Sequence, residues 1–208
     1  MENMHVAVLL FEEFETLDVF GPVEILGRLR NEYGIRFYSL AGGDISNSHG
    51  VTIYTRKLQE IEAGVDIFLI PGGYGTRTEV ANDPLIKAIR EISLSSSYVL
   101  TVCTGTALLA KTGLLDNKKA TTNKKAYDWV ISHGKKVNWI QKARWVTDGK
   151  FYTSSGVSAG MDMTLDFLKD RHGIGTARQV ADEIEYMWTE DPARDHFHKK
   201  RQANAHKS

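Results

Sequence analysis

The segment YVLTVCTGTALLAKTGLLDNKKATT, residues 98–122, decides the fold class of this chain. An apolar run over 98–102 ends at Cys103, and helical spacing begins at once and continues to Gly113. A residue on such a strand-to-helix turn is held in a tight backbone above the end of the sheet. The start of the helix directs N–H groups and a positive dipole end toward the sulfur, so we expect a lowered Cys103 pKa. The alternative for a lone cysteine is a small buried hydrophobic residue.

Alternating strands and helices extend in both directions from this segment. The spacing of apolar residues predicts strands over 5–11, 35–41, 65–70 and 98–102, helices over 16–33, 83–94, 104–112, 157–169 and 175–188, and hairpins around 51–56 and Asp148-Gly149. This order predicts an α/β fold: a doubly wound, mostly parallel sheet with helices on both faces and small β-hairpin additions. Without a linker or repeat, residues 1–190 are expected to form one domain, followed by a charged tail over 191–208.

Composition narrows the class of protein. The formal net charge is zero, so nothing indicates a nucleic-acid surface or a polybasic membrane patch. No apolar run approaches the roughly 20 residues of a membrane span, and the N-terminus has no basic region of a signal peptide. The single cysteine excludes an internal disulfide. We therefore expect a cytoplasmic protein whose partner is a small molecule.

Two further motifs fall where strands end, the place at which open α/β sheets bind ligands. In LIPGGYG (69–75), the backbone N–H groups of Gly72 and Gly73 could line an oxyanion or substrate site, or the pair could form a plain turn. In FEEFETLDVFGPVEIL (11–26), Glu15 and Asp18 lie three residues apart near a helix start, which could place both on one face. Such carboxylates usually complement the helix dipole, but one that faces a cysteine could act as a general acid or base.

Together these stretches resemble the ThiJ/PfpI superfamily, of the class I glutamine amidotransferase-like fold, over about residues 5–190. The matching stretches are LDVFGPVEIL (17–26), IPGG (70–73), VCTGTALLAKTGLLDNKKATT (102–122), TSSGVSAGMDMTLDFL (153–168) and IEY (184–186). Within the superfamily, the pattern is similar to that of isocyanide hydratases and of the amidase-like domains of AraC-type regulators. The resemblance implies a flavodoxin-like sheet and a homodimer.

The resemblance also implies roles for individual residues. Cys103 matches the nucleophile, Asp18 the acid that the hydratases pair with it, and Thr104 the threonine of their CTG motif. The backbone N–H groups of Gly73 and Thr104 match the oxyanion site of the superfamily. Glu15 lies near the position where the glyoxalase-like branch keeps its glutamate, so either carboxylate could face the sulfur.

Two departures narrow the implied chemistry. Thr104 stands where PfpI-type peptidases carry a histidine, and Asn123 stands where many relatives read ATTH. A Cys-His dyad of peptidase or amidotransferase type is therefore not expected. The implied activity is that of a hydro-lyase, without cofactor or metal, converting an isocyanide to an N-substituted formamide through a thioimidate-like adduct on Cys103. The alternatives are a glyoxalase- or deglycase-like enzyme on small dicarbonyls, with Glu15 as base, and a non-enzymatic redox or stress sensor in which Cys103 is oxidised.

Overall fold

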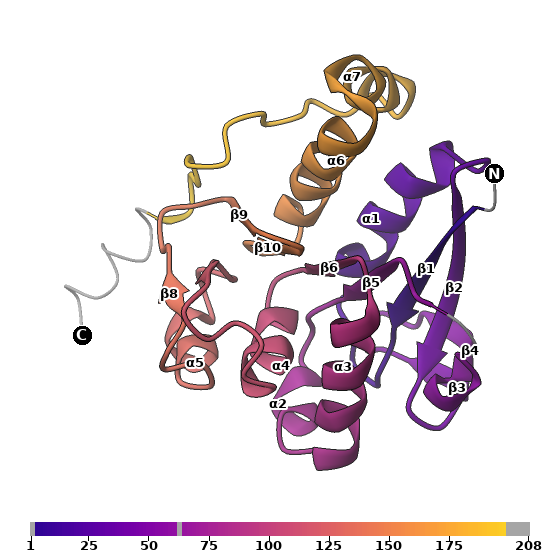
Figure 1. The fold of residues 1–208 in the computed structure, drawn as a ribbon, viewed down its shortest axis with the longest axis vertical. Helices are drawn as coiled ribbons and strands as arrows, with labels where there is room; N and C mark the ends of the chain where they lie inside the picture. The colour runs from indigo at the N-terminus through magenta and orange to yellow at the C-terminus, as the bar shows by residue number, and fades with distance from the viewer. Residues whose placement is uncertain (1–2, 62–63, 199–208) are drawn as a thin grey trace.

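The computed structural model describes residues 3–61 and 64–198 (Figure 1). Its elements are β1 (Met4–Leu9), α1 (Thr16–Arg28), β2 (Tyr33–Ser39), β3 (Gly43–Ser46), β4 (Thr52–Lys57), a 3-10 turn (Leu58–Glu60), β5 (Ile67–Ile70), α2 (Thr76–Glu79), α3 (Asp83–Ser95), β6 (Tyr98–Thr101), α4 (Gly105–Lys111), β7 (Lys119–Ala120), α5 (Tyr127–Ile131), β8 (Asn138–Trp139), β9 (Trp145–Asp148), β10 (Phe151–Ser154), α6 (Ala159–His172) and α7 (Ile174–Glu183). Within the described ranges, no helix has the length and apolar character needed to cross a membrane.

Eight strands form one sheet in the order β3-β4-β2-β1-β5-β6-β10-β9. All neighbours from β4 to β10 are parallel, whereas the β3-β4 and β9-β10 pairs are antiparallel hairpins. Helices α1, α6 and α7 cover one face, and α3 and α4 cover the other (Figure 1). The order β2-β1-β5-β6-β10 is the 2-1-3-4-5 order of flavodoxin-like sheets. The predicted fold class and both predicted hairpins are confirmed.

Burial on both faces explains why the central strands read as unbroken apolar runs. Every residue of β5, with the sequence IFLI, is buried, as expected for a parallel strand covered by helices on both sides. The predicted helix over 16–33 is too long, because α1 ends at Arg28. Strand pairing sets this limit: Tyr33 begins the register of β2 with β1, opposite Met4, and cannot also belong to a helix.

The fold brings the motifs to one edge of the sheet. Strands β1, β5 and β6 are adjacent and parallel, so the segments that follow them leave the sheet side by side. The strand order reverses between β1 and β5, which is the switch point where doubly wound sheets bind ligands. Strand β10 ends next to β6 and adds the segment that begins at Ser155.

Candidate active site

Cys103 occupies the predicted turn between β6 and α4. Its φ is +57°, a left-handed conformation that non-glycine residues adopt rarely. Two backbone contacts hold it there: its N–H donates to the carbonyl of Ser155 at 3.2 Å, and its carbonyl accepts from Oγ1 of Thr122 at 2.7 Å. A Cβ on Gly105 would lie 2.4 Å from the carbonyl oxygen of Ile70, so only glycine lets α4 begin this close to β5. The sulfur is thus fixed at the edge of the sheet.

Three N–H donors surround the Cys103 sulfur. Nδ2 of Asn123 donates to Sγ at 3.0 Å, and the backbone N–H groups of Thr104 and Val157 also hydrogen-bond to it. The orientation of the Asn123 amide is set by its other end, because Oδ1 accepts from the N–H of Ala126 at 2.9 Å. These donors stabilise negative charge on sulfur during a reaction.

Asp18, on the first turn of α1, is the carboxyl beside the sulfur. It has no solvent exposure, its Oδ2 accepts from the N–H of Gly72 at 2.9 Å, its Oδ1 has no hydrogen-bond partner among the described residues, and its pKa is influenced by the neighbouring Cys103 thiol. Burial is the main cause that raises the Asp18 pKa to about 8, and the nearby Glu15 raises it further, against the N–H of Gly72 and the thiol. Asp18 therefore carries a proton at neutral pH. Of the two candidate carboxylates, Asp18 is the one that contacts the sulfur.

The expected lowering of the Cys103 pKa is wrong for this geometry. Burial and, second, the Asp18 carboxyl raise the pKa of the thiol, and the three N–H donors oppose them without reversing the shift. The cause is the depth of the turn: the Cys103 residue is only 6% exposed, so the charged form loses hydration that the helix start does not replace. At neutral pH both members of the pair hold their protons.

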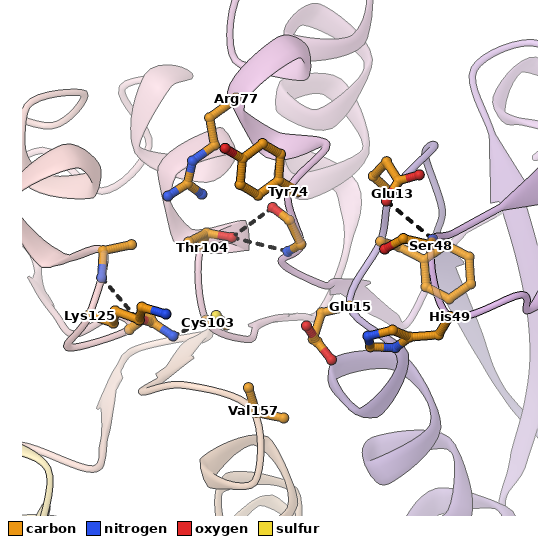
Figure 2. A pocket seen from close by; sticks show the side chains of 14 residues that line it. Glu13, Glu15, Ser48, His49, Tyr74, Arg77, Cys103, Thr104, Lys125 and Val157 are labelled. Atoms are coloured by element: carbon orange, nitrogen blue, oxygen red, sulfur yellow. Dashed lines mark hydrogen bonds between the residues drawn. The ribbon is translucent and has the colours of Figure 1, made fainter.

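Cys103 lies at the floor of a cleft of about 530 Å³. Figure 2 shows Arg77 and Tyr74 above the sulfur, Glu15 and His49 to its right, and Lys125 to its left. Glu15 precedes α1 as its N-cap residue and is partly exposed in the cleft wall, whereas Asp18 is covered. Within residues 3–61 and 64–198, no group of three His, Cys, Asp or Glu side chains is placed to hold a metal ion.

The predicted oxyanion groups already have partners. The N–H of Gly73 donates to Oγ1 of Thr104 at 3.1 Å, and the Thr104 hydroxyl lies 3.3 Å from the Gly73 carbonyl; these are the two dashed lines at Thr104 in Figure 2. Thr76 Oγ1 lies 3.1 Å from Thr104 Oγ1. The N–H of Gly72 holds Asp18, and the N–H of Thr104 is directed at the sulfur. These groups therefore hold Cys103 and Asp18 in place, and an oxyanion would have to displace a hydrogen bond to use the N–H of Gly73.

The sequence did not predict several residues of the site. In the sequence, Asn123 stands out only as a departure from a histidine, yet in the structure it donates to the sulfur. Val157, with φ at +47°, contributes its N–H from the turn after β10. His49 reaches the cleft from the β3-β4 hairpin, where its Nδ1 lies 2.8 Å from Oγ1 of Thr16. A glycine directly after a strand, Gly156, was the one available signal for the turn at Val157.

Comparison with known proteins places this geometry in a family. The chain is 29% identical over 184 residues to the isonitrile hydratase of Pseudomonas putida, a match covering 88% of this chain and 78% of that protein. It is 26% identical over 182 residues to the HTH-type transcriptional regulator CdhR of Pseudomonas aeruginosa, covering 85% of this chain but only 53% of the regulator. The crystal structure of a ThiJ/PfpI family protein from Pseudomonas syringae superposes with a TM-score of 0.83 at 21% identity, over 100% of this chain and 88% of that one. The family model described as "DJ-1/PfpI family" matches residues 4–170. The chain therefore belongs to the DJ-1/PfpI family.

Proposed function

We propose that this protein is a cofactor-independent hydro-lyase that converts an isocyanide to an N-substituted formamide, with Cys103 as nucleophile and Asp18 as general acid. One observation carries the proposal: a fully buried carboxyl, held by the N–H of Gly72, lies beside a cysteine at the floor of a cleft, and burial raises the pKa of that carboxyl to about 8. An isocyanide carbon must gain both a nucleophile and a proton. A buried thiol beside a protonated carboxyl supplies both at the same atom.

The reaction balances without a cofactor. Asp18 gives its proton to the terminal carbon of R–N≡C while Sγ of Cys103 bonds to that carbon, and the thiol proton passes to Asp18. The adduct is Cys–S–CH=N–R, which contains every atom of the thiol and the isocyanide. Water adds to its carbon, a proton moves to nitrogen, and the C–S bond breaks to release R–NH–CHO and the thiol. Asp18 hands the proton over at each step and ends protonated.

The neighbouring groups support this chemistry by position. Asn123 donates to the sulfur and would stabilise the negative charge that develops on it as the C–S bond breaks, before the thiol is re-formed. Gly72 holds the Asp18 carboxyl, and a Cβ there would lie 2.7 Å from Asp18 Oδ2, so the position requires glycine. Thr104 and Gly73 form the hydrogen bond that closes this part of the floor.

The alternatives have less support from the site. A dicarbonyl reaction with Glu15 as base needs Glu15 against the sulfur, the position that Asp18 occupies. Sensing by oxidation needs a thiolate, and burial raises the Cys103 pKa. A regulatory role is suggested by relatives such as CdhR, of which this chain spans about half the length.

The proposal also includes a homodimer and a small-molecule substrate in the cytoplasm. The homodimer and the substrate class follow from the family resemblance, and the cytoplasm from the lone cysteine.

Proton NMR of purified protein with a simple alkyl isocyanide tests the proposal. The wild type should produce the formyl proton signal of the N-substituted formamide, and Cys103→Ala should produce none above the buffer rate. Because the substitution changes volume little, circular dichroism of Cys103→Ala should match the wild type. Parallel incubation with methylglyoxal separates the alternatives: turnover of the dicarbonyl without turnover of the isocyanide would reject the hydratase assignment.

A further inference from the structure

A short segment near the end of the described chain packs behind the active site. The carbonyl of Pro192 accepts from the N–H of Arg144 at 2.7 Å, and the N–H of Asp195 donates to the carbonyl of Lys142 at 3.1 Å. Arg144 in turn accepts at its carbonyl from the N–H of Ser155 at 2.7 Å. Residues 192–195 are therefore hydrogen-bonded to the backbone of residues 142–144, and Arg144 is in turn hydrogen-bonded to Ser155, where the turn after β10 begins.

Asp195 is buried within this packing. It is 5% exposed, its Oδ2 accepts from Oγ of Ser155 at 2.5 Å, and the Nζ of Lys124 lies 3.6 Å from the same oxygen. Lys124 is 4% exposed, and its ammonium also donates to Oγ1 of Thr121 and to the carbonyl of Ala143. A buried ammonium needs a counter-charge, so the aspartate and the lysine hold each other in place.

The two segments that Asp195 joins are those that hold the cysteine. The segment with Lys124 supplies the donor from Asn123 to the sulfur. The segment with Ser155 accepts from the N–H of Cys103 and supplies the N–H of Val157 to the sulfur. Asp195 itself does not line the cleft.

We propose that Asp195 is a positioning residue for Cys103: by joining Lys124 to Ser155 it keeps the donors of Asn123 and Val157 on the sulfur. The inference rests on the reactive cysteine of the proposed function, and not on the identity of the substrate. If the donor from Asn123 or Val157 is loosened, the Cys103 thiolate is less stabilised. The reactivity of Cys103 should therefore depend on the Asp195 carboxylate, which does not contact the sulfur.

The rate of iodoacetamide labelling against pH, followed by intact mass, tests this, because Cys103 is the only cysteine of the chain. Asp195→Asn should move the midpoint of the labelling rate to higher pH by about one unit. Below that midpoint, the fraction of Cys103 present as thiolate is then roughly tenfold lower. The matched control is Asp191→Asn, the same change in the same segment, since exposed Asp191 bonds to the N–H of Ala193. Its profile should equal that of the wild type. Asp18 in contact with the sulfur, and Glu13, Glu15, His49, Arg77 and Lys125 along the cleft, are unchanged in both variants. Asp195→Asn also removes the negative charge beside Lys124, which by itself would lower the midpoint, so a rise reports lost positioning and a fall contradicts the positioning role.

Ser155→Ala keeps the test decisive if Asp195→Asn does not fold. It removes the hydrogen bond to Asp195 but leaves the ion pair with Lys124, so a smaller shift in the same direction is expected. A folded Asp195→Asn with the wild-type profile, or an unfolded one together with an unshifted Ser155→Ala, overturns the positioning role. Absence of isocyanide turnover in the wild type would remove the proposed reaction and leave these labelling results unaffected.

Discussion

Two buried aspartates lie near Cys103 in opposite electrostatic surroundings. Asp18 faces the thiol and a backbone N–H, and among the described residues no ammonium or guanidinium group pairs with it. Asp195 faces the Lys124 ammonium and the Ser155 hydroxyl. The first carboxyl is protonated near neutral pH because burial penalises its charge, whereas the second is held by a cation.

The surroundings of each carboxyl determine what it can do. A buried acid without a cation can give up and regain a proton near neutral pH, which suits proton transfer. A buried carboxylate locked to a lysine is suited to joining chain segments. The same residue type is therefore suited to proton transfer in one place and to positioning in the other, and its partner makes the difference.

The largest effect is expected from Asp18→Asn. The amide keeps the size of the side chain but has no acidic proton, so isocyanide turnover should fall by about 10²–10⁴-fold, the usual contribution of general acid–base catalysis. Steady-state formation of the formamide measures it. Turnover within threefold of the wild type would show that Asp18 does not transfer the proton.

The same pair of aspartates should show opposite effects on stability. Burial raises the Asp18 pKa from 3.8 to about 8, so stability falls as pH rises between these values, because the unfolded chain releases a proton that the folded chain retains. Asp18→Asn removes that penalty and should be more stable than the wild type at pH 8. Asp195→Asn removes the carboxylate of a buried ion pair with Lys124 and should cost about 3–5 kcal/mol. Urea unfolding at pH 8 measures both, and shifts of the same sign would contradict the contrast.

The sequence predicted the parts of this site that depend on local pattern. The run at 98–102 followed by helical spacing located the cysteine turn, and Gly72-Gly73 located the neighbouring strand exit. It left open whether Asp18 or Glu15 faces the sulfur, because that depends on how α1 lies against Gly72. It predicted the wrong pKa direction for Cys103, since burial depth follows from packing across the whole sheet. The Asp195–Ser155 contact joins residues 40 apart, and no spacing rule indicates it.

A smaller effect is expected from Asn123→Ala. A hydrogen bond to a charged group contributes about 1.5 kcal/mol or more, so losing the donor should lower turnover and iodoacetamide labelling at neutral pH by roughly tenfold. Asn138→Ala is the matched control, because Asn138 is exposed and donates to the carbonyl of Asn117, in the β7-β8 region. Equal labelling rates for the two variants would remove Asn123 from the group that stabilises the sulfur.

The smallest effect is expected from Glu15→Gln, which changes a carboxylate at the start of the same helix. Glu15 is partly exposed, and its loss should alter helix-start electrostatics by under roughly 1 kcal/mol, or less than about fivefold in turnover. Measured on the same isocyanide, this variant gives the contrast with Asp18→Asn. A loss as large as that of Asp18→Asn would move the acid role to Glu15.

The pH dependence of isocyanide hydration tests the Cys103–Asp18 pair most directly. Asp18 must begin the reaction protonated, and its pKa is raised to about 8, so kcat/KM of the wild type should be maintained below that pH and fall above it. Asp18→Asn should be slow and should not show this fall. We predict a wild-type midpoint within about one unit of pH 8. Wild-type activity that keeps rising through pH 9, or the same fall in Asp18→Asn, would contradict the assignment of Asp18 as the proton donor.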